Sequence, residues 1–378
     1  MKKFYLLTPG PTPVPQDVLN EMANPIIHHR TPNFKAIFKE TNELLKYVFQ
    51  TTNPIITFAS SGTGAMEASV VNTLSKGDKA IVIIGGKFGE RFMEICKAYG
   101  VEVIEVKVNN GDAVDSLVIK DLLKKNSDVK AVFATLCETS TATLTDIKSI
   151  GEVIRDTKAI LIVDAISGLG ADVLKTDEWG VDMVVSGSQK GLMMPPGLAF
   201  LSVSKKAIEL VEKSTLPKYY FNLKKALKTL EKDDTPWTPA VSLVIGLRKS
   251  LQMIKEEGIE NVYARHAKMS EATREACKAM GLTLLSSSPS NAVTAAWSPQ
   301  GISGKEIVKF CRDKHEVFIA AGQGELEEKI FRVAHLGYMK KFDIIIAISA
   351  VEIALKTLGY KFQFGKGLAK AEEILSTC

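Results

Sequence analysis

Two charged residues follow apolar segments of this sequence, and both are of types that take part in covalent or acid–base chemistry. Asp164 ends the run 160–163, and burying a carboxylate there is costly unless it caps a helix or faces a cation. Lys190 comes 26 residues later, just past the apolar run 183–186, among small polar residues. A lysine amine can form a Schiff base with a carbonyl compound. Taken alone, Lys190 could equally be a surface lysine.

A third feature is the glycine-rich turn at 60–68, which follows an apolar run and opens a helical pattern. Gly62 and Gly64 let the backbone approach a ligand closely, and the start of the helix offers free N–H groups. Ser61 and Thr63 add hydroxyl groups, so the turn suits a phosphate. An ordinary helix cap with a glycine turn accounts for the same residues equally well.

The three features gain meaning together, because each follows a predicted strand and therefore falls at the same edge of one sheet. A Schiff-base amine, an acid for a protonated ring nitrogen and a phosphate cup are the combination that pyridoxal 5′-phosphate (PLP) requires. We therefore predict PLP as the cofactor, attached to Lys190 and paired through its ring nitrogen with Asp164.

The elements that would position these residues alternate between short apolar runs and amphipathic helices. Buried strands are predicted at 55–59, 80–84, 101–106, 131–136, 159–163, 183–186 and 198–203. Helical patterns lie between them, at 64–74, 90–99, 116–124 and 147–155. This alternation predicts an α/β domain with a mostly parallel seven-stranded sheet, flanked by helices and joined by right-handed crossovers.

Other segments predict an arm and a second domain. Three prolines and a glycine at 8–13 indicate an extended N-terminal arm, assigned to residues 1–15. A large domain is predicted at 16–255 and a smaller α+β domain at 256–378. Further helices are expected at 33–49, 241–255 and 261–280, and further strands at 293–297, 317–320 and 330–333. Two Thr-Pro pairs at 235–239 forbid a continuous helix there.

Composition and missing motifs narrow the function. The chain has 378 residues and a net charge of +5 spread along its length, so nucleic-acid binding is not expected. Five cysteines without a CxxC pair indicate reduced thiols. No signal peptide or membrane span is expected either. Together these two observations predict a cytoplasmic protein. GxGxxG, P-loop, HExxH and GxSxG motifs are absent, and no metal site is expected.

Several motifs, in order along the chain, resemble those of the fold-type I PLP enzymes, specifically the class V aminotransferases of the alanine/serine–glyoxylate group. The resemblance covers nearly the whole chain and rests on Pro9–Thr12, His29-Arg30, Ser61–Gly64, Gly86–Arg91, Glu138–Thr141, Val163–Ala165, Ser186–Lys190, Thr235–Pro239 and Phe331–Val333. Two departures stand out. Phe88 occupies a position where many relatives have Trp, and Leu136-Cys137 replaces the His-Gly pair of some, with Cys137 expected to be a small buried residue.

The resemblance implies a role for each matched cofactor residue. Lys190 is similar to the lysine that carries the cofactor and, once released, moves the proton, and Asp164 is similar to the partner of the pyridine nitrogen. Phe88 would stack on the ring, and the Thr139 hydroxyl would lie near the ring oxygen. The residues that would hold the phosphate are Ser61, Gly62, Thr63 and Gln189.

Other matched positions concern the substrate and a second subunit. Arg332 resembles the arginine that clamps the substrate carboxylate, a task suited to its planar fork. Gly10 would also contact the substrate. Thr235 and Thr238 resemble residues that reach the phosphate of the neighbouring subunit, which implies a homodimer with shared sites.

The expected function is a ping-pong aminotransferase that moves an amino group from alanine or serine to glyoxylate or pyruvate. An aspartate donor is an alternative that needs a second cation near the substrate side chain, and Arg30 is the candidate. The other expected role of Arg30 is structural, pairing with an acid at the dimer interface. A PLP lyase or cysteine desulfurase would need a reactive cysteine on a mobile loop, and Cys311 fits badly because it lies in a predicted helix, 305–314. A non-catalytic PLP-binding subunit of a larger complex is the third alternative.

Overall fold

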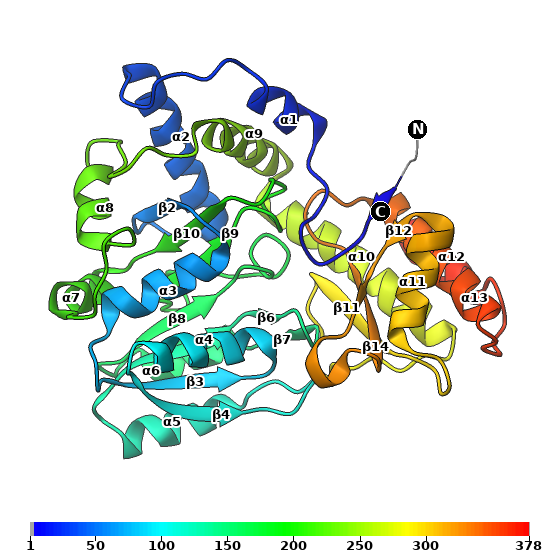
Figure 1. Ribbon diagram of the computed structural model, residues 1–378. Coiled ribbons are helices and arrows are strands. Elements are labelled where there is room, and N and C mark those ends of the chain that lie inside the picture. Colours follow the sequence, from blue (N-terminus) through cyan, green and yellow to red (C-terminus); the bar gives the residue numbers. More distant parts are fainter. Residues whose placement is uncertain (1–3, 378) are drawn as a thin grey trace.

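The computed structural model describes residues 4–377 and is built around a seven-stranded sheet (Figure 1). The strands are, in spatial order, β2 Ile55–Ala59, β10 Leu198–Ser202, β9 Met183–Gly187, β8 Ile160–Asp164, β5 Val129–Thr135, β3 Lys79–Ile84 and β4 Glu102–Lys107. Strand β10 runs antiparallel to both of its neighbours, and every other pairing is parallel. The sheet is therefore mostly parallel, as predicted.

Helices cover both faces of this sheet. Along β3, Ile81 and Ile83 join one apolar cluster and Val82 and Ile84 join another, because successive side chains of a strand point to opposite faces. The first cluster packs against α1 Gln16–Met22, α2 Pro32–Phe49, α5 Ser116–Lys125, α6 Ile147–Ile154 and α9 Val241–Glu257. The second packs against α3 Gly62–Thr73, α4 Lys87–Ala98, α7 Lys205–Lys213 and α8 Leu223–Leu230.

A smaller group of elements lies beside the large sheet (Figure 1). Its antiparallel sheet consists of β11 Val293–Trp297, β14 Ile330–Ala334 and β13 Ala320–Ala321, in that order. Around it pack α11 Gly304–His315, α12 Lys341–Thr357 and α13 Lys366–Leu375, with the short 3₁₀ helix Gly324–Leu326 beside them. Helix α10, Ile259–Ala279, joins the two parts: Val262 packs in the large core and Met269 in the small one. The domain boundary at residue 255 stays a prediction.

The N-terminal arm is extended, and it lies against the smaller sheet region. Strand β1, Tyr5–Leu6, pairs in parallel with β12, Val317–Phe318. The strand predicted at 317–320 is thus two strands, β12 and β13, which belong to different sheets. A second short pairing joins β6 Cys137–Glu138 to β7 Thr143–Leu144.

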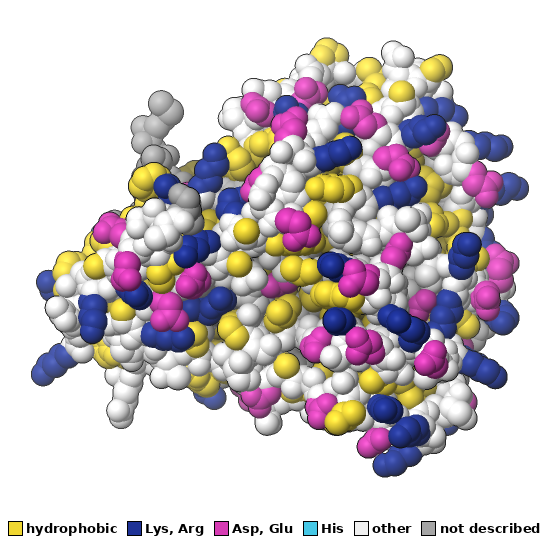
Figure 2. Space-filling model, turned by 180° about the vertical axis from the view of Figure 1, so that it is seen from behind, with side chains coloured by type: hydrophobic (Ala, Val, Ile, Leu, Met, Phe, Trp, Pro, Cys, Tyr) yellow, Lys and Arg dark blue, Asp and Glu magenta, His cyan; other side chains and the backbone are white. Residues whose placement is uncertain are grey.

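Helix α8 lies in a lysine-rich segment for which the sequence pattern indicated no helix. The Asn222 side chain accepts a hydrogen bond from the Lys225 N–H at 3.1 Å and so caps its start. The helix ends at Leu230, ahead of the Thr-Pro pairs. In the described part of the chain, no helix is long and apolar enough to cross a membrane. Acidic and basic side chains are interspersed on the face drawn in Figure 2.

Candidate functional site

The ends of several parallel strands bring the predicted site residues to one edge of the large sheet. Asp164 is the last residue of β8, and Lys190 follows β9 by three residues. Helix α3 begins at Gly62 after β2, and helix α4 begins at Lys87 after β3. Because β2, β3, β8 and β9 run in the same direction, their carboxyl ends meet where ligands bind in such sheets.

The Lys190 amine is buried and held by two acceptors. Its side chain is 8% exposed, and Nζ donates to the carbonyl of Pro9 and to the hydroxyl of Ser167, the latter at 3.0 Å. Burial lowers the pKa of Lys190 to about 8, against the opposing effect of the Asp164 carboxylate. A larger fraction of this amine is therefore uncharged near neutral pH than for a surface lysine. The burial of the side chain excludes the interpretation of Lys190 as a surface residue.

Gly10 makes room for this lysine. Its φ of 129° lies in the region that favours glycine, and a Cβ added there would stand 2.4 Å from the Cε of Lys190. The Thr12 hydroxyl donates to the Lys190 carbonyl at 3.0 Å. The arm thus contacts both the backbone and the side chain of the lysine.

Asp164 is a buried carboxylate with one oxygen in use. Its Oδ1 accepts from the Ile166 N–H at 2.8 Å, and no group among the described residues donates to Oδ2. Burial raises the pKa of Asp164 to about 7, and the charges of Lys190 and Arg91 act in the opposite direction. A cation placed next to Oδ2 would stabilise the ionised form, which is what a protonated pyridine nitrogen would do.

Arg332, on β14, reaches this edge from the smaller sheet. Its Nη1 donates to the Thr139 carbonyl at 2.7 Å, while Nε and Nη2 donate to the Ala321 carbonyl at 3.0 and 2.7 Å. Three of its five N–H donors are used in this way, which leaves one on each terminal nitrogen. Burial lowers the pKa of Arg332 to about 10, so the side chain stays cationic at neutral pH. The arrangement can accept a carboxylate.

Helices α3 and α4 both begin next to the predicted site residues, but only the start of α3 is free to receive a phosphate. The buried Glu138 carboxylate accepts the N–H groups of Phe88 and Gly89, at 3.0 and 3.1 Å, and so occupies the start of α4. At α3 no side-chain oxygen from the described residues caps the first N–H groups. A phosphate would therefore bind at Gly62 and Thr63, because the N-terminus of α3 is open and positively polarised.

The other predicted cofactor residues surround this helix start. Thr63 Oγ1 accepts from Arg91 Nη1 at 3.2 Å, and the Arg91 guanidinium lies 4.9 Å from the centre of the Phe88 ring. Phe88 is half-buried and is not a core residue, and Ser61 is exposed. The Gln189 Oε1 atom is buried without a hydrogen-bond partner among residues 4–377.

Together these observations fit PLP. An amine with a lowered pKa, a carboxylate with a free oxygen and an open helix start are left for a ligand with an aldehyde, a ring nitrogen and a phosphate.

Sequence reasoning missed several members of the site. Ser167 contacts both Lys190 and Thr139, whose Oγ1 donates to Ser167 Oγ at 2.5 Å. Ile166 lies so close to Gly62 that a Cβ on the glycine would meet its Cδ1 at 2.4 Å. Arg91 was predicted to belong to the motif Gly86–Arg91, but its contact with Thr63 was not predicted. Ser167 stands three residues after Asp164, and that spacing was the one available signal.

Thr235 and Thr238 do not join the Lys190 cluster within this chain. The Thr235 hydroxyl donates to the Trp237 carbonyl in its own loop, at 2.7 Å, and Thr238 is exposed. Arg30, the candidate second cation, pairs with Asp234 and donates to the Thr235 carbonyl at 2.9 Å. Arg30 is thus paired with an acid of its own chain, and the predicted pairing at a dimer interface stays a prediction.

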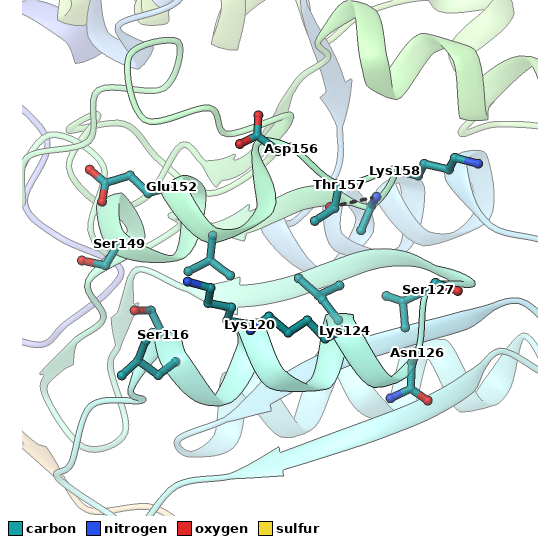
Figure 3. A pocket seen from close by; sticks show the side chains of 15 residues that line it. Ser116, Lys120, Lys124, Asn126, Ser127, Ser149, Glu152, Asp156, Thr157 and Lys158 are labelled. Atoms are coloured by element: carbon teal, nitrogen blue, oxygen red, sulfur yellow. Dashed lines mark hydrogen bonds between the residues drawn. The ribbon is translucent and has the colours of Figure 1, made fainter.

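A surface groove, Cys137 and a possible metal site were also considered as functional features, and none of them adds to the Lys190 site. A surface groove of about 800 Å³ between α5 and α6 exposes Lys120, Lys124 and Asp156 (Figure 3), and no predicted site residue lines it. Cys137 is buried, and burial raises the pKa of its thiol. No group of three or more His, Cys, Asp or Glu side chains within 4–377 is placed to hold a metal ion.

Comparison with known proteins places these features in a family. The model of the family "Aminotransferase class-V" matches residues 4–339. The chain is 42% identical to a Synechococcus protein described as the small subunit of a soluble hydrogenase, over 99% of both chains. It is 35% identical to the L-aspartate–glyoxylate aminotransferase of Paracoccus denitrificans, covering 97% of this chain and 95% of the relative. The crystal structure of the ureidoglycine–glyoxylate aminotransferase of Bacillus subtilis is similar with a TM-score of 0.94 at 28% identity, over 100% of this chain and 99% of the other.

Proposed function

This chain belongs to the class-V aminotransferases, a family of PLP-dependent transaminases, and we propose that it moves an amino group from a small amino acid, alanine or serine, to a 2-oxo acid, glyoxylate or pyruvate. The observation that carries the proposal is the buried Lys190 amine, which faces the same sheet edge as the Asp164 carboxylate and the open start of α3. In this proposal PLP is bound by that set of residues.

In this proposal some residues bind the cofactor and Lys190 transfers the proton. The N–H groups at the start of α3 and the side-chain NH2 of Gln189 would donate to the phosphate. Phe88 would pack on the ring, and Asp164 would keep the ring nitrogen protonated. PLP, when bound, supplies an aldehyde that accepts the amino group and a ring that takes up the electron pair of a broken bond at the substrate α-carbon. Lys190, with its pKa near 8, would hold and return the proton at Nζ.

Arg332 would orient the substrate. Its two unused N–H donors can bind the carboxylate common to amino acids and 2-oxo acids. The acceptor is proposed as glyoxylate because relatives named for three different donors share it: L-aspartate–glyoxylate, serine–glyoxylate and ureidoglycine–glyoxylate aminotransferases. The pairing of Arg30 with Asp234 disfavours Arg30 as the cation for an aspartate side chain and supports a small donor.

We also propose a cytoplasmic homodimer. Thr235 and Thr238 lie apart from the Lys190 cluster of their own chain, which is compatible with a role at the site of a partner. The test is the mass of the native protein together with the cofactor affinity of Thr235→Ala. A monomer with full activity would contradict this part of the proposal.

Two alternatives are less well supported. A cysteine desulfurase needs a mobile reactive thiol, whereas Cys311 is buried in α11 and burial raises the pKa of its thiol to about 12. The hydrogenase-subunit name belongs to a relative, and a non-catalytic subunit would not require the amine, carboxylate and guanidinium to stay together as they do here.

The deciding experiment compares Lys190→Ala with Lys361→Ala, which replaces an exposed lysine. The wild type and Lys361→Ala are expected to bind PLP covalently, so that borohydride reduction adds the cofactor mass to the peptide containing residue 190. Both should transaminate alanine or serine with glyoxylate, and Lys190→Ala should do neither. A colourless wild type without a mass adduct would refute the proposal.

A further inference from the structure

The Ser167 side chain forms hydrogen bonds with both Lys190 and Thr139. It is 5% exposed, its Oγ accepts from Lys190 Nζ at 3.0 Å, and it accepts from Thr139 Oγ1 at 2.5 Å. These are the partners of its hydroxyl in the described chain. The side chain therefore does not serve the local turn after β8, as a capping serine would.

The two acceptors around Lys190 fix the direction of its lone pair. A neutral amine on a lysine has two hydrogens and one lone pair. The Pro9 carbonyl and the Ser167 hydroxyl each accept one hydrogen, which leaves the lone pair directed away from both. Gly10, which lacks a Cβ, leaves the space that the Lys190 methylenes fill on that side.

We propose that Ser167 is a positioning residue that, together with the Pro9 carbonyl, aims the lone pair of the free Lys190 amine at the α-carbon of the bound substrate. The inference rests on the proposed function, because it concerns the state in which the amine is free to exchange a proton. It assigns Ser167 no contact with the reacting atoms.

The connection continues to the substrate carboxylate. Arg332 Nη1 donates to the Thr139 carbonyl at 2.7 Å, and the Thr139 hydroxyl donates to Ser167. The group that would clamp the carboxylate and the group that aims the amine are thus held by one intermediate residue. This fixes the distance between the carboxylate site and the amine, as proton transfer in a defined geometry requires.

The test compares Ser167→Ala and Ser167→Thr with Ser270→Ala, which removes a buried serine hydroxyl on α10 that forms hydrogen bonds with the Ala267 carbonyl and the Asn291 side chain. In Ser167→Ala, kcat with alanine and glyoxylate should fall about tenfold or more, equivalent to about 1.4 kcal/mol in the barrier. The KM for alanine should change less than about twofold, and the isotope effect with α-deuterated alanine should rise, because proton transfer becomes slower. Ser167→Thr should recover most of kcat, and Ser270→Ala should keep the wild-type isotope effect.

A second readout uses the cofactor-free protein. The Ser167 hydroxyl binds an ammonium more strongly than a neutral amine, so its loss should leave more neutral amine. Labelling of Lys190 by trinitrobenzenesulfonate at pH 7 should then be as fast as in the wild type or faster, although kcat is lower. If Ser167→Ala kept the wild-type kcat and isotope effect, or if a folded, cofactor-bound Ser167→Thr were as slow as Ser167→Ala, the inference would be overturned. A wild type that neither binds PLP nor transaminates would instead refute the proposed function.

Discussion

Replacing Asp164 by Asn should stabilise the cofactor-free protein at high pH while removing its activity. Burial raises the pKa of Asp164 to about 7 from an ordinary value of 3.8, which at about 1.36 kcal/mol per pH unit corresponds to about 4 kcal/mol. Below pH 4 the carboxyl is protonated in both the folded and the unfolded chain, so it costs nothing. Between pH 4 and 7 the unfolded chain ionises first, and the folded state loses stability as the pH rises. Asn keeps the acceptor for the Ile166 N–H and does not ionise.

The assay is urea unfolding of the cofactor-free wild type, Asp164→Asn and Asp121→Asn at pH 4, 5.5, 7 and 8.5. Asp121 is exposed on α5 and serves as the control, with an expected change within about 0.5 kcal/mol at every pH. The advantage of Asp164→Asn over the wild type should be near zero at pH 4 and should approach about 4 kcal/mol at pH 8.5. A difference that does not vary with pH would refute the reasoning, because it would show that the carboxylate is not desolvated.

Two further predictions concern the smaller sheet region. Arg332→Lys keeps the positive charge but loses the planar guanidinium that can bind a carboxylate with two hydrogen bonds. The KM for every amino donor should therefore rise about tenfold or more, while the affinity for the cofactor is retained. Steady-state kinetics with a panel of donors measures this, and an unchanged KM would contradict the carboxylate role. The buried Glu352 carboxylate accepts the N–H groups of Gly365, Gly367 and Leu368 at 2.9, 2.7 and 3.2 Å. Glu352→Gln should therefore lower the free energy of unfolding by about 1–3 kcal/mol, whereas the control Glu372→Gln, on the exposed face of α13, should leave it unchanged. Equal free energies for the two variants in denaturant unfolding would count against this account.

The large sheet could be predicted from the sequence because its strands are buried on both faces. Runs such as 160–163 and 183–185 are continuously apolar, and that pattern is typical of a central parallel strand. The short pairings could not be predicted, since β12 and β13 are contiguous in a single β-rich run and are separated only by their partners in space. Helix α8 was missed because its many lysines obscure a narrow apolar face.

The candidate site was predictable where a residue follows a strand directly. Lys190, Asp164 and Gly62 were found in this way, whereas Ser167 and the Pro9 carbonyl depend on how a loop and the arm fold back. A backbone carbonyl carries no side-chain signal at all. The Glu138 carboxylate, which decides between the two helix starts, could be assigned only after both helices were placed beside it.

The pairing of β1 with β12 has a consequence for how this protein can be altered at its beginning. Strand β1 precedes Pro9 and Gly10, which lie against Lys190, and it pairs with Val317–Phe318, more than 300 residues later in the chain. During synthesis that anchor emerges late, so the arm stays unpaired until most of the chain has left the ribosome. A truncation that removes residues 1–9 would spare the large sheet and still leave the Lys190 amine without the Pro9 carbonyl as an acceptor.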